Sequence, residues 1–193
     1  MRVTYPQYFA GPVASFGDPA APLLVVGLAP GLHGANATGR PFTGDHAGVL
    51  LYATLHRFGF ASRQTSRAAD DGLKLRACRI TNAVRCVPPA NKPVADEVNN
   101  CRPFLREELD RVPATGVVLA LGGVAHKAIL AALGLRQAAF VFGHGAEHAL
   151  PGGPRLLDSY HCSRYNTQTG RLTPAMFHRV FARARRLLEE QAG

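Results

Sequence analysis

The sequence has 193 residues, of which 47% are hydrophobic and 18% charged, a balance that fits one soluble globular domain over residues 1–193. No run reaches the roughly 18 apolar residues of a membrane-spanning helix, and the N-terminus lacks the apolar core of a signal peptide, so we expect a cytoplasmic protein without a membrane partner. The net charge of +9 predicts a polyanion partner, most simply nucleic acid, although a basic surface kept for solubility is the alternative.

Apolar runs and helical spacing predict alternating strands and helices along the chain. Residues 1–22 read as an irregular arm and 61–75 as a surface loop. The predicted strands cover 23–28, 79–84, 116–121 and 155–160, with a further short strand at 139–142 inside the otherwise loop-like segment 136–153. The predicted helices cover 47–58, 95–110, 122–133 and 174–190. Pro103 should kink or interrupt the second of these helices.

This alternation predicts an α/β fold in which helices cover both faces of a parallel sheet. In such folds the ligand binds beyond the carboxyl ends of the strands. Polar residues follow three of the four main strand ends, at Gly27–Asp45, at Asn82 and at His161–Asn166. We therefore expect these three segments to meet in a single site.

The first of these segments contains GLAPG at 27–31, where Gly and Pro force a sharp turn that brings backbone N–H groups towards a ligand. An ordinary strand-to-loop turn is the alternative, and the pattern is neither a dinucleotide fingerprint nor a phosphate loop. Phe42 is either a stacking platform for a flat ligand such as a base or a member of the core. Asp45 is placed to cap the helix that follows it.

The other two strand ends carry an amide and an imidazole. The side chain of Asn82 offers donors and an acceptor for the amide edge of a pyrimidine, or it ties down a neighbouring loop. His161 can donate a hydrogen bond to a developing oxyanion, although a single histidine is more often structural. After it, Arg164, Tyr165 and Asn166 form a basic and aromatic loop suited to entering a nucleic-acid groove.

Three motifs together resemble one known family. The segments GLAPGLHGANATGRPFTGD, TNAVRCVPPANKP with CRPFL, and HCSRYNTQTGRLT are similar to those of the type 5 (type b) uracil-DNA glycosylases, in the uracil-DNA glycosylase superfamily, and the resemblance runs from about Gly17 to Ala184. It implies a three-layer α/β/α sandwich with a four-stranded parallel central sheet. The implied partner is DNA containing deaminated bases, and we expect a monomer.

The resemblance also implies the chemistry and the residues that carry it. A monofunctional glycosylase of this kind flips uracil, or hypoxanthine or xanthine, out of DNA and hydrolyses its N-glycosidic bond, leaving an abasic site. The catalytic candidates are His161, Asn82 and Asn36, with Asp45 as a more distant candidate for holding the water. The base-binding candidates are Gly27, Ala29, Gly31, Phe42 and Asn82, and the DNA-binding candidates are Arg164, Tyr165 and Asn166.

The family commonly carries a 4Fe-4S cluster held by four cysteines. Cys86 and Cys101 match the second pair of ligands, but the upstream C-x-x-C pair is absent, and Cys78 and Cys162 stand at other positions. We therefore expect an incomplete or absent cluster, an N-terminal segment missing from this sequence, and a complete cluster only in a longer chain. The chemistry itself needs no cofactor.

Two alternatives to a glycosylase remain open from the sequence. One is a catalytically decayed DNA-binding relative that has lost the cluster ligands. The other is a Rossmann-like enzyme for small molecules that is merely basic, against which the absence of a nucleotide phosphate motif argues.

Overall fold

The computed structural model describes residues 3–89 and 93–190. Residues 1–2 of the predicted arm, and residues 90–92 of the segment VPPANKP, lie outside the described residues. The strands are β1 (Phe16–Gly17), β2 (Leu23–Gly27), β3 (Cys78–Asn82), β4 (Val117–Leu121), β5 (Glu147–Ala149) and β6 (Arg155–Ser159). The helices are α1 (Ala35–Thr38), α2 (His46–Arg57), α3 (Ala95–Asp110), α4 (Gly123–Ala132), the 3-10 turn η2 (Gln137–Ala139), α5 (Arg164–Gln168) and α6 (Pro174–Glu190).

The sheet has the order β1-β3-β2-β4-β6-β5. The four central strands pair in parallel, as predicted, and their bounds agree with the predicted ones to within two residues. The prediction of a purely four-stranded parallel sheet is corrected, because β1 and β5 add antiparallel pairs at the two edges. The sheet is therefore mixed and six-stranded, while its parallel core is the predicted one.

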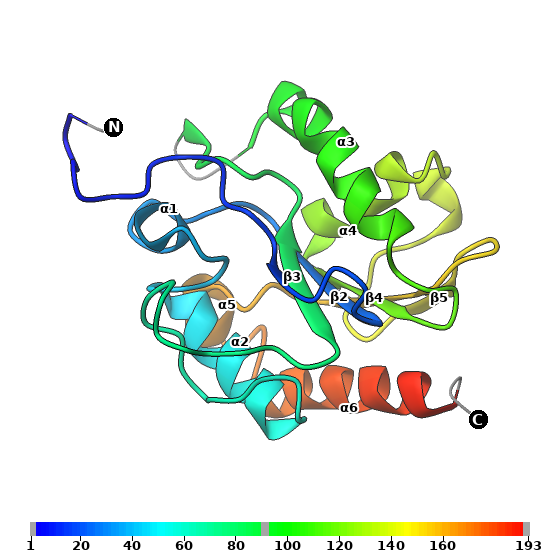
Figure 1. Cartoon of the computed structure of the whole chain (residues 1–193). Helices are drawn as coiled ribbons and strands as arrows, with labels where there is room; N and C mark the ends of the chain where they lie inside the picture. Colours follow the sequence, from blue (N-terminus) through cyan, green and yellow to red (C-terminus); the bar gives the residue numbers. More distant parts are fainter. Residues whose placement is uncertain (1–2, 90–92, 191–193) are drawn as a thin grey trace.

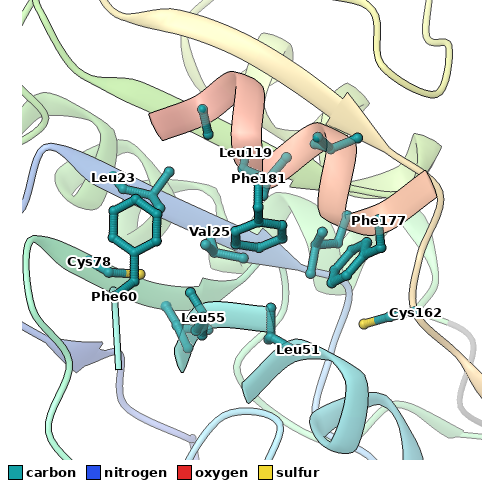
Figure 2. Packing of buried hydrophobic residues seen from close by; sticks show 14 of the residues in the cluster. Leu23, Val25, Leu51, Leu55, Phe60, Cys78, Leu119, Cys162, Phe177 and Phe181 are labelled. Atoms are coloured by element: carbon teal, nitrogen blue, oxygen red, sulfur yellow. The ribbon is translucent and has the colours of Figure 1, made fainter. Parts of the chain in front are cut away.

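Helices cover both faces of the sheet, which confirms the α/β prediction: α3 and α4 lie on one face and α2 and α6 on the other (Figure 1). Side chains alternate along β2, so that Leu23 and Val25 face α2 and α6 while Leu24 and Val26 face α3 and α4. In Figure 2, Phe181 of α6 lies over Val25. Such strands, buried on both faces, appear in the sequence as continuous apolar runs.

Three predicted details differ from the structure. The arm is irregular except for β1, which pairs with β3. The predicted strand at 139–142 is wrong, because η2 ends there and the extra strand is β5, which pairs with β6. Helix α3 runs through Pro103 without interruption. Pro103 is exposed, so water can serve the carbonyl group that loses its intrahelical donor.

Of the helices in the described ranges, none combines the length and the apolar character needed to cross a membrane.

Candidate active site

A cavity of about 760 Å³ opens at the carboxyl ends of the parallel strands. Its walls come from three separate segments: the loops after β2, the last residue of β3, and the segment after β6. The predicted strand ends therefore do meet in one place. The lining residues are Leu28–Ala35, Phe42, Gly44–Ala47, Asn82, His161, Ser163 and Arg164.

Phe42 belongs both to the cavity wall and to the core. The residue is only 5% exposed and packs in the cluster between the sheet and helices α2 and α6. Its ring also lines the cavity and stacks on the ring of His161, with the centroids 6.0 Å apart and the planes 29° apart. Its backbone has φ of +54°, an uncommon value for a bulky residue, which turns the segment between Pro41 and Thr43 sharply.

Asn82, the last residue of β3, is 5% exposed and lines the cavity. Its Oδ1 atom is buried and has no hydrogen-bond partner within the part of the chain that the structure describes. A buried amide oxygen without a partner costs free energy, and such groups gather where a ligand completes them.

Gly27 makes room for this amide. A Cβ atom at Gly27 would lie 2.3 Å from Oδ1 of Asn82 and 2.5 Å from Cζ of Phe42, so only glycine fits without displacing both side chains. Gly27 itself is absent from the cavity wall, whereas Ala29 and Gly31 line it.

The ring of His161 lies beside the ring of Phe42 on the cavity wall. The residue is half-buried and lines the cavity. This burial lowers the pKa of the His161 imidazole to about 4, so the ring is neutral at pH 7 and carries one N–H donor. Nδ2 of Asn166 donates to the His161 carbonyl oxygen at 2.8 Å, which fixes the backbone that carries the ring.

Asp45 is the one acidic residue among the described residues that line the cavity. As predicted, it caps α2, and its Oδ1 atom accepts a hydrogen bond from the Gly48 N–H at 2.9 Å. Its Oδ2 atom lies against the loop that follows β2, 3.6 Å from where a Cβ atom of Gly31 would be. Burial raises the pKa of the Asp45 carboxyl group above its ordinary value.

Asn36 lies close behind this loop but not on the cavity wall. It is buried in α1, and its Nδ2 atom donates to the Leu32 carbonyl oxygen at 3.3 Å. The catalytic role of Asn36 stays a prediction, and the structure brings Asp45 rather than Asn36 to the cavity.

The predicted DNA-binding loop contains the short helix α5, capped by the Ser163 hydroxyl group. Arg164 and Tyr165 are exposed, and Tyr165 keeps 71% of its surface accessible. The Asn166 side chain is occupied by the His161 carbonyl group. His46 at the start of α2 bonds Thr167 of α5, Nε2 to Oγ1, at 2.9 Å, and thereby joins the first motif to the last.

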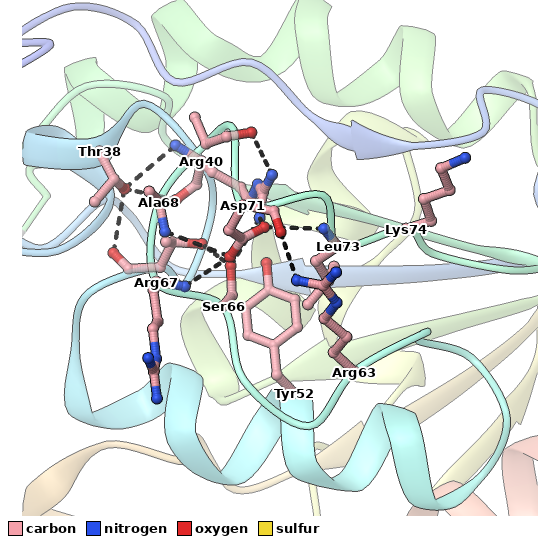
Figure 3. Close-up of polar contacts among 12 residues, drawn as sticks. Thr38, Arg40, Tyr52, Arg63, Ser66, Arg67, Ala68, Asp71, Leu73 and Lys74 are labelled. Atoms are coloured by element: carbon pink, nitrogen blue, oxygen red, sulfur yellow. Dashed lines mark hydrogen bonds and ion pairs between the residues drawn. The ribbon is translucent and has the colours of Figure 1, made fainter.

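An ion pair between the buried Arg40 and the half-buried Asp71 was not foreseen from the sequence. Arg40, with a side chain 6% exposed, bonds Oδ1 of Asp71 at 2.7 Å and Oγ of Ser66 at 3.0 Å (Figure 3). Asp71 also accepts hydrogen bonds from the backbone N–H groups of Arg67 and Leu73, and the Arg40 charge together with these bonds lowers the pKa of its carboxyl group despite desolvation. The predicted surface loop 61–75 is therefore fastened to the GRPFTGD segment.

The four cysteines fall into two pairs. Cys78 and Cys162 are fully buried in the core between the sheet, α2 and α6, where desolvation raises the pKa of both thiols. Cys86 is exposed and Cys101 half-buried. Burial first, and then the neighbouring charges of Cys101 and Glu97, raise the pKa of Cys86, so these two thiols are neighbours.

The comparisons with known proteins agree with this geometry. The family model for the uracil DNA glycosylase superfamily matches residues 14–185. A type-5 uracil-DNA glycosylase of Thermus thermophilus is 52% identical over 93% of this chain and 82% of its own. Type-5 enzymes of Pyrobaculum aerophilum, at 45% identity over 92% of this chain and 77% of their own, and of Mycobacterium leprae, at 44% over 93% and 80%, are also similar. The chain belongs to the uracil DNA glycosylase superfamily.

Proposed function

We propose that this protein is a monofunctional DNA-repair glycosylase that flips uracil out of DNA and hydrolyses its N-glycosidic bond, leaving an abasic site. The observation that carries the proposal is the buried, unpartnered amide oxygen of Asn82 in a cavity that also holds Phe42 and a neutral His161. The catalytically decayed alternative has no support, because the similar relatives are named as glycosylases.

We propose that the base is recognised by the side-chain amide of Asn82, whose Oδ1 atom has no partner among the described residues. Uracil presents an N–H group beside a carbonyl oxygen, and this edge satisfies both the acceptor and the donors of an amide side chain. Cytosine presents a lone pair where uracil has its N–H group, and would leave Oδ1 of Asn82 unpaired. Hypoxanthine and xanthine share the N–H and carbonyl pair, so we propose that they are accepted as well. The ring of Phe42 supplies a stacking surface for each of these bases.

The bond breaks with both electrons leaving on the base. As the bond between C1′ and the base nitrogen lengthens, negative charge develops on the base and the sugar becomes an oxocarbenium-like cation. The neutral His161 donates its N–H to a base oxygen and stabilises the departing anion. A neutral donor suits this step, because the base is released as an anion and takes its proton later from solvent.

Water then adds to C1′ and loses its proton, which completes the hydrolysis. We propose that Asp45 holds this water and that its negative charge stabilises the sugar cation. The cation is itself a strong electrophile, so a powerful base is unnecessary. The apolar side chains of Leu28 and Ala29 leave Asp45 as the carboxylate that the cavity wall offers.

The test is an excision assay on a labelled duplex that contains one uracil, followed by alkali to cut at abasic sites. The parent protein should cut this strand and spare the corresponding cytosine duplex. His161→Ala should lower the single-turnover rate by about 10²–10³, as expected for the loss of one oxyanion donor, while DNA affinity is kept. Unchanged turnover in His161→Ala would remove that residue's role, and no cutting by the parent would remove the proposal.

A 4Fe-4S cluster stands outside this mechanism. Such a cluster takes four cysteine thiolates, and the neighbouring Cys86 and Cys101 supply two. Within the described ranges these two thiols belong to no group of three closely spaced metal-ligating side chains, so a complete cluster does not fit these residues alone. We propose that any cluster held there has a structural role. We also propose that the enzyme acts as a cytoplasmic monomer on DNA.

A further inference from the structure

A second cavity, of about 640 Å³, lies beside the active-site cavity. The two cavities share Gly44, Asp45, His46 and Arg164, so they are continuous over the start of α2. One wall of the second cavity is the outer face of α2, and the opposite wall is the segment Gln64–Arg67 of the fastened loop. We call this second cavity the α2 groove.

The loop wall of the α2 groove is held in place before any ligand binds. Arg40 bonds both Ser66 and Asp71, Asp71 accepts the backbone N–H of Arg67, and Oγ1 of Thr43 bonds Oγ of Ser66 at 2.7 Å. The groove wall is therefore hydrogen-bonded to Thr43, the residue that follows Phe42 in the chain. Loops that carry binding residues gain affinity when they are ordered in advance.

The α2 groove is cationic. Arg67 and Arg164 line it, and the ion pairs found among the described residues involve other arginines. Figure 3 shows the Arg67 side chain directed away from Asp71, which is already matched by Arg40. Among the described residues that line the groove, the one acid is Asp45, and this carboxylate also caps α2.

The rest of the lining suits a sugar–phosphate chain. Gln64 and Thr65 offer neutral polar groups, and Val49, which is 67% exposed, offers an apolar surface for the face of a deoxyribose. Most contacts between proteins and DNA go to phosphate and sugar, and arginine is a preferred donor for phosphate.

We propose that the α2 groove holds the sugar–phosphate backbone of the nucleotides next to the flipped one on the damaged strand, with Arg67 and Arg164 contacting phosphates. This inference rests on the proposed function, because it takes the flipped base to occupy the neighbouring cavity. The two cavities join at the shared residues Asp45 and His46, so a strand whose base enters the first cavity can continue from there into the groove.

The test measures binding to a duplex that holds 2′-fluoro-2′-deoxyuridine, which resists cleavage because fluorine destabilises the sugar cation. Arg67→Ala should weaken affinity about two- to fivefold at 0.1 M salt and lower the slope of log Kd against log salt by about 0.9. Arg76→Ala is the matched control: Arg76 is also exposed, but it precedes β3 at the far end of the sheet and should change neither quantity.

A scan of single phosphates then locates the contact. Replacing one phosphate at a time by a neutral methylphosphonate should weaken binding of the parent at several flanking positions. In Arg67→Ala the loss should vanish at one position beside the damaged nucleotide and persist at the others. Val49→Glu, which adds a negative charge at an exposed place in the groove, should weaken binding, whereas Val141→Glu on another exposed site should not.

Identical scans for the parent and Arg67→Ala, with unaltered salt slopes, would overturn this inference while excision by the parent left the proposed function intact. Failure of the parent to excise uracil would instead overturn the proposed function.

Discussion

Gly27 has no side chain, and this leaves room for Asn82 and Phe42, two side chains that line the active-site cavity. The positions of Asn82 Oδ1 and Phe42 Cζ leave no space for a Cβ atom there, although the backbone of Gly27 lies outside the left-handed region and would accept alanine. The demand for glycine is therefore one of space, and the space serves the two side chains that we propose to hold the base.

We predict that Gly27→Ala lowers the uracil excision rate by about 10²-fold, because displacement of positioning groups by about an ångström has effects of this size. Overpacking should also reduce the free energy of unfolding by about 1–3 kcal/mol. Gly153→Ala in the turn before β6 meets its nearest atoms at 3.8 Å and is the control. Single-turnover rates and urea denaturation together test this, and an active but destabilised Gly27→Ala would assign Gly27 to packing alone.

The buried imidazole of His161 gives a prediction about pH. Its pKa is lowered to about 4, so the neutral donor persists throughout the range in which a free histidine titrates, near 6.5. The single-turnover rate should therefore show no step between pH 6 and 8. Protonation of Asp45, whose pKa is raised, should slow the reaction at lower pH. A rate that changes with a midpoint near 6.5, and still does so in Asp45→Asn, would contradict a neutral donor.

Among the elements, the loop 61–75, which the ion pair between Arg40 and Asp71 fastens, shows a kind of contact that the sequence does not predict. Arg40 stands in a segment whose varied chemistry predicted a site, but Asp71 lies in a polar run typical of an exposed loop. No local sequence pattern predicts a contact between two residues that lie 31 positions apart in the chain. The edge strands β1 and β5 escaped prediction for the same reason, because strands of two and three residues are defined by their partners.

We predict that Asp71→Asn reduces the free energy of unfolding by about 3 kcal/mol at pH 7, because it leaves the buried Arg40 without its charged partner. The folded-state pKa of Asp71 lies below the unfolded value. The stabilisation is therefore present above about pH 4 and is lost as the pH falls below it. Urea denaturation of Asp71→Asn and of the exposed neighbour variant Asp70→Asn should differ at pH 7, and the difference should shrink as the pH falls below about 4. Equal midpoints at pH 7 would contradict this prediction.

For the whole molecule, the sequence predicted the parallel core and the place of the site better than it predicted the roles within it. Four apolar runs predicted the four buried strands. Because the carboxyl ends of parallel strands lie at the same edge of a sheet, the three polar segments that follow them were expected to meet there. The positions of Asn36 and Asp45 relative to the cavity needed the structure, because both stand in one polar segment of the sequence and the folded chain brings Asp45 to the cavity wall. The net charge of +9 agreed with a DNA partner but did not locate Arg67 beside the cavity.

The burial of Cys78 and Cys162 has a practical consequence. Both thiols sit between the sheet and its helices, whereas Cys86 is exposed and Cys101 half-buried. A thiol-reactive dye added to the native protein should attach to the second pair, and the first pair becomes reactive only when the layers separate. The natural cysteines thus provide both a labelling handle outside the walls of the active-site cavity and the α2 groove and a built-in reporter of global opening, without any engineered residue.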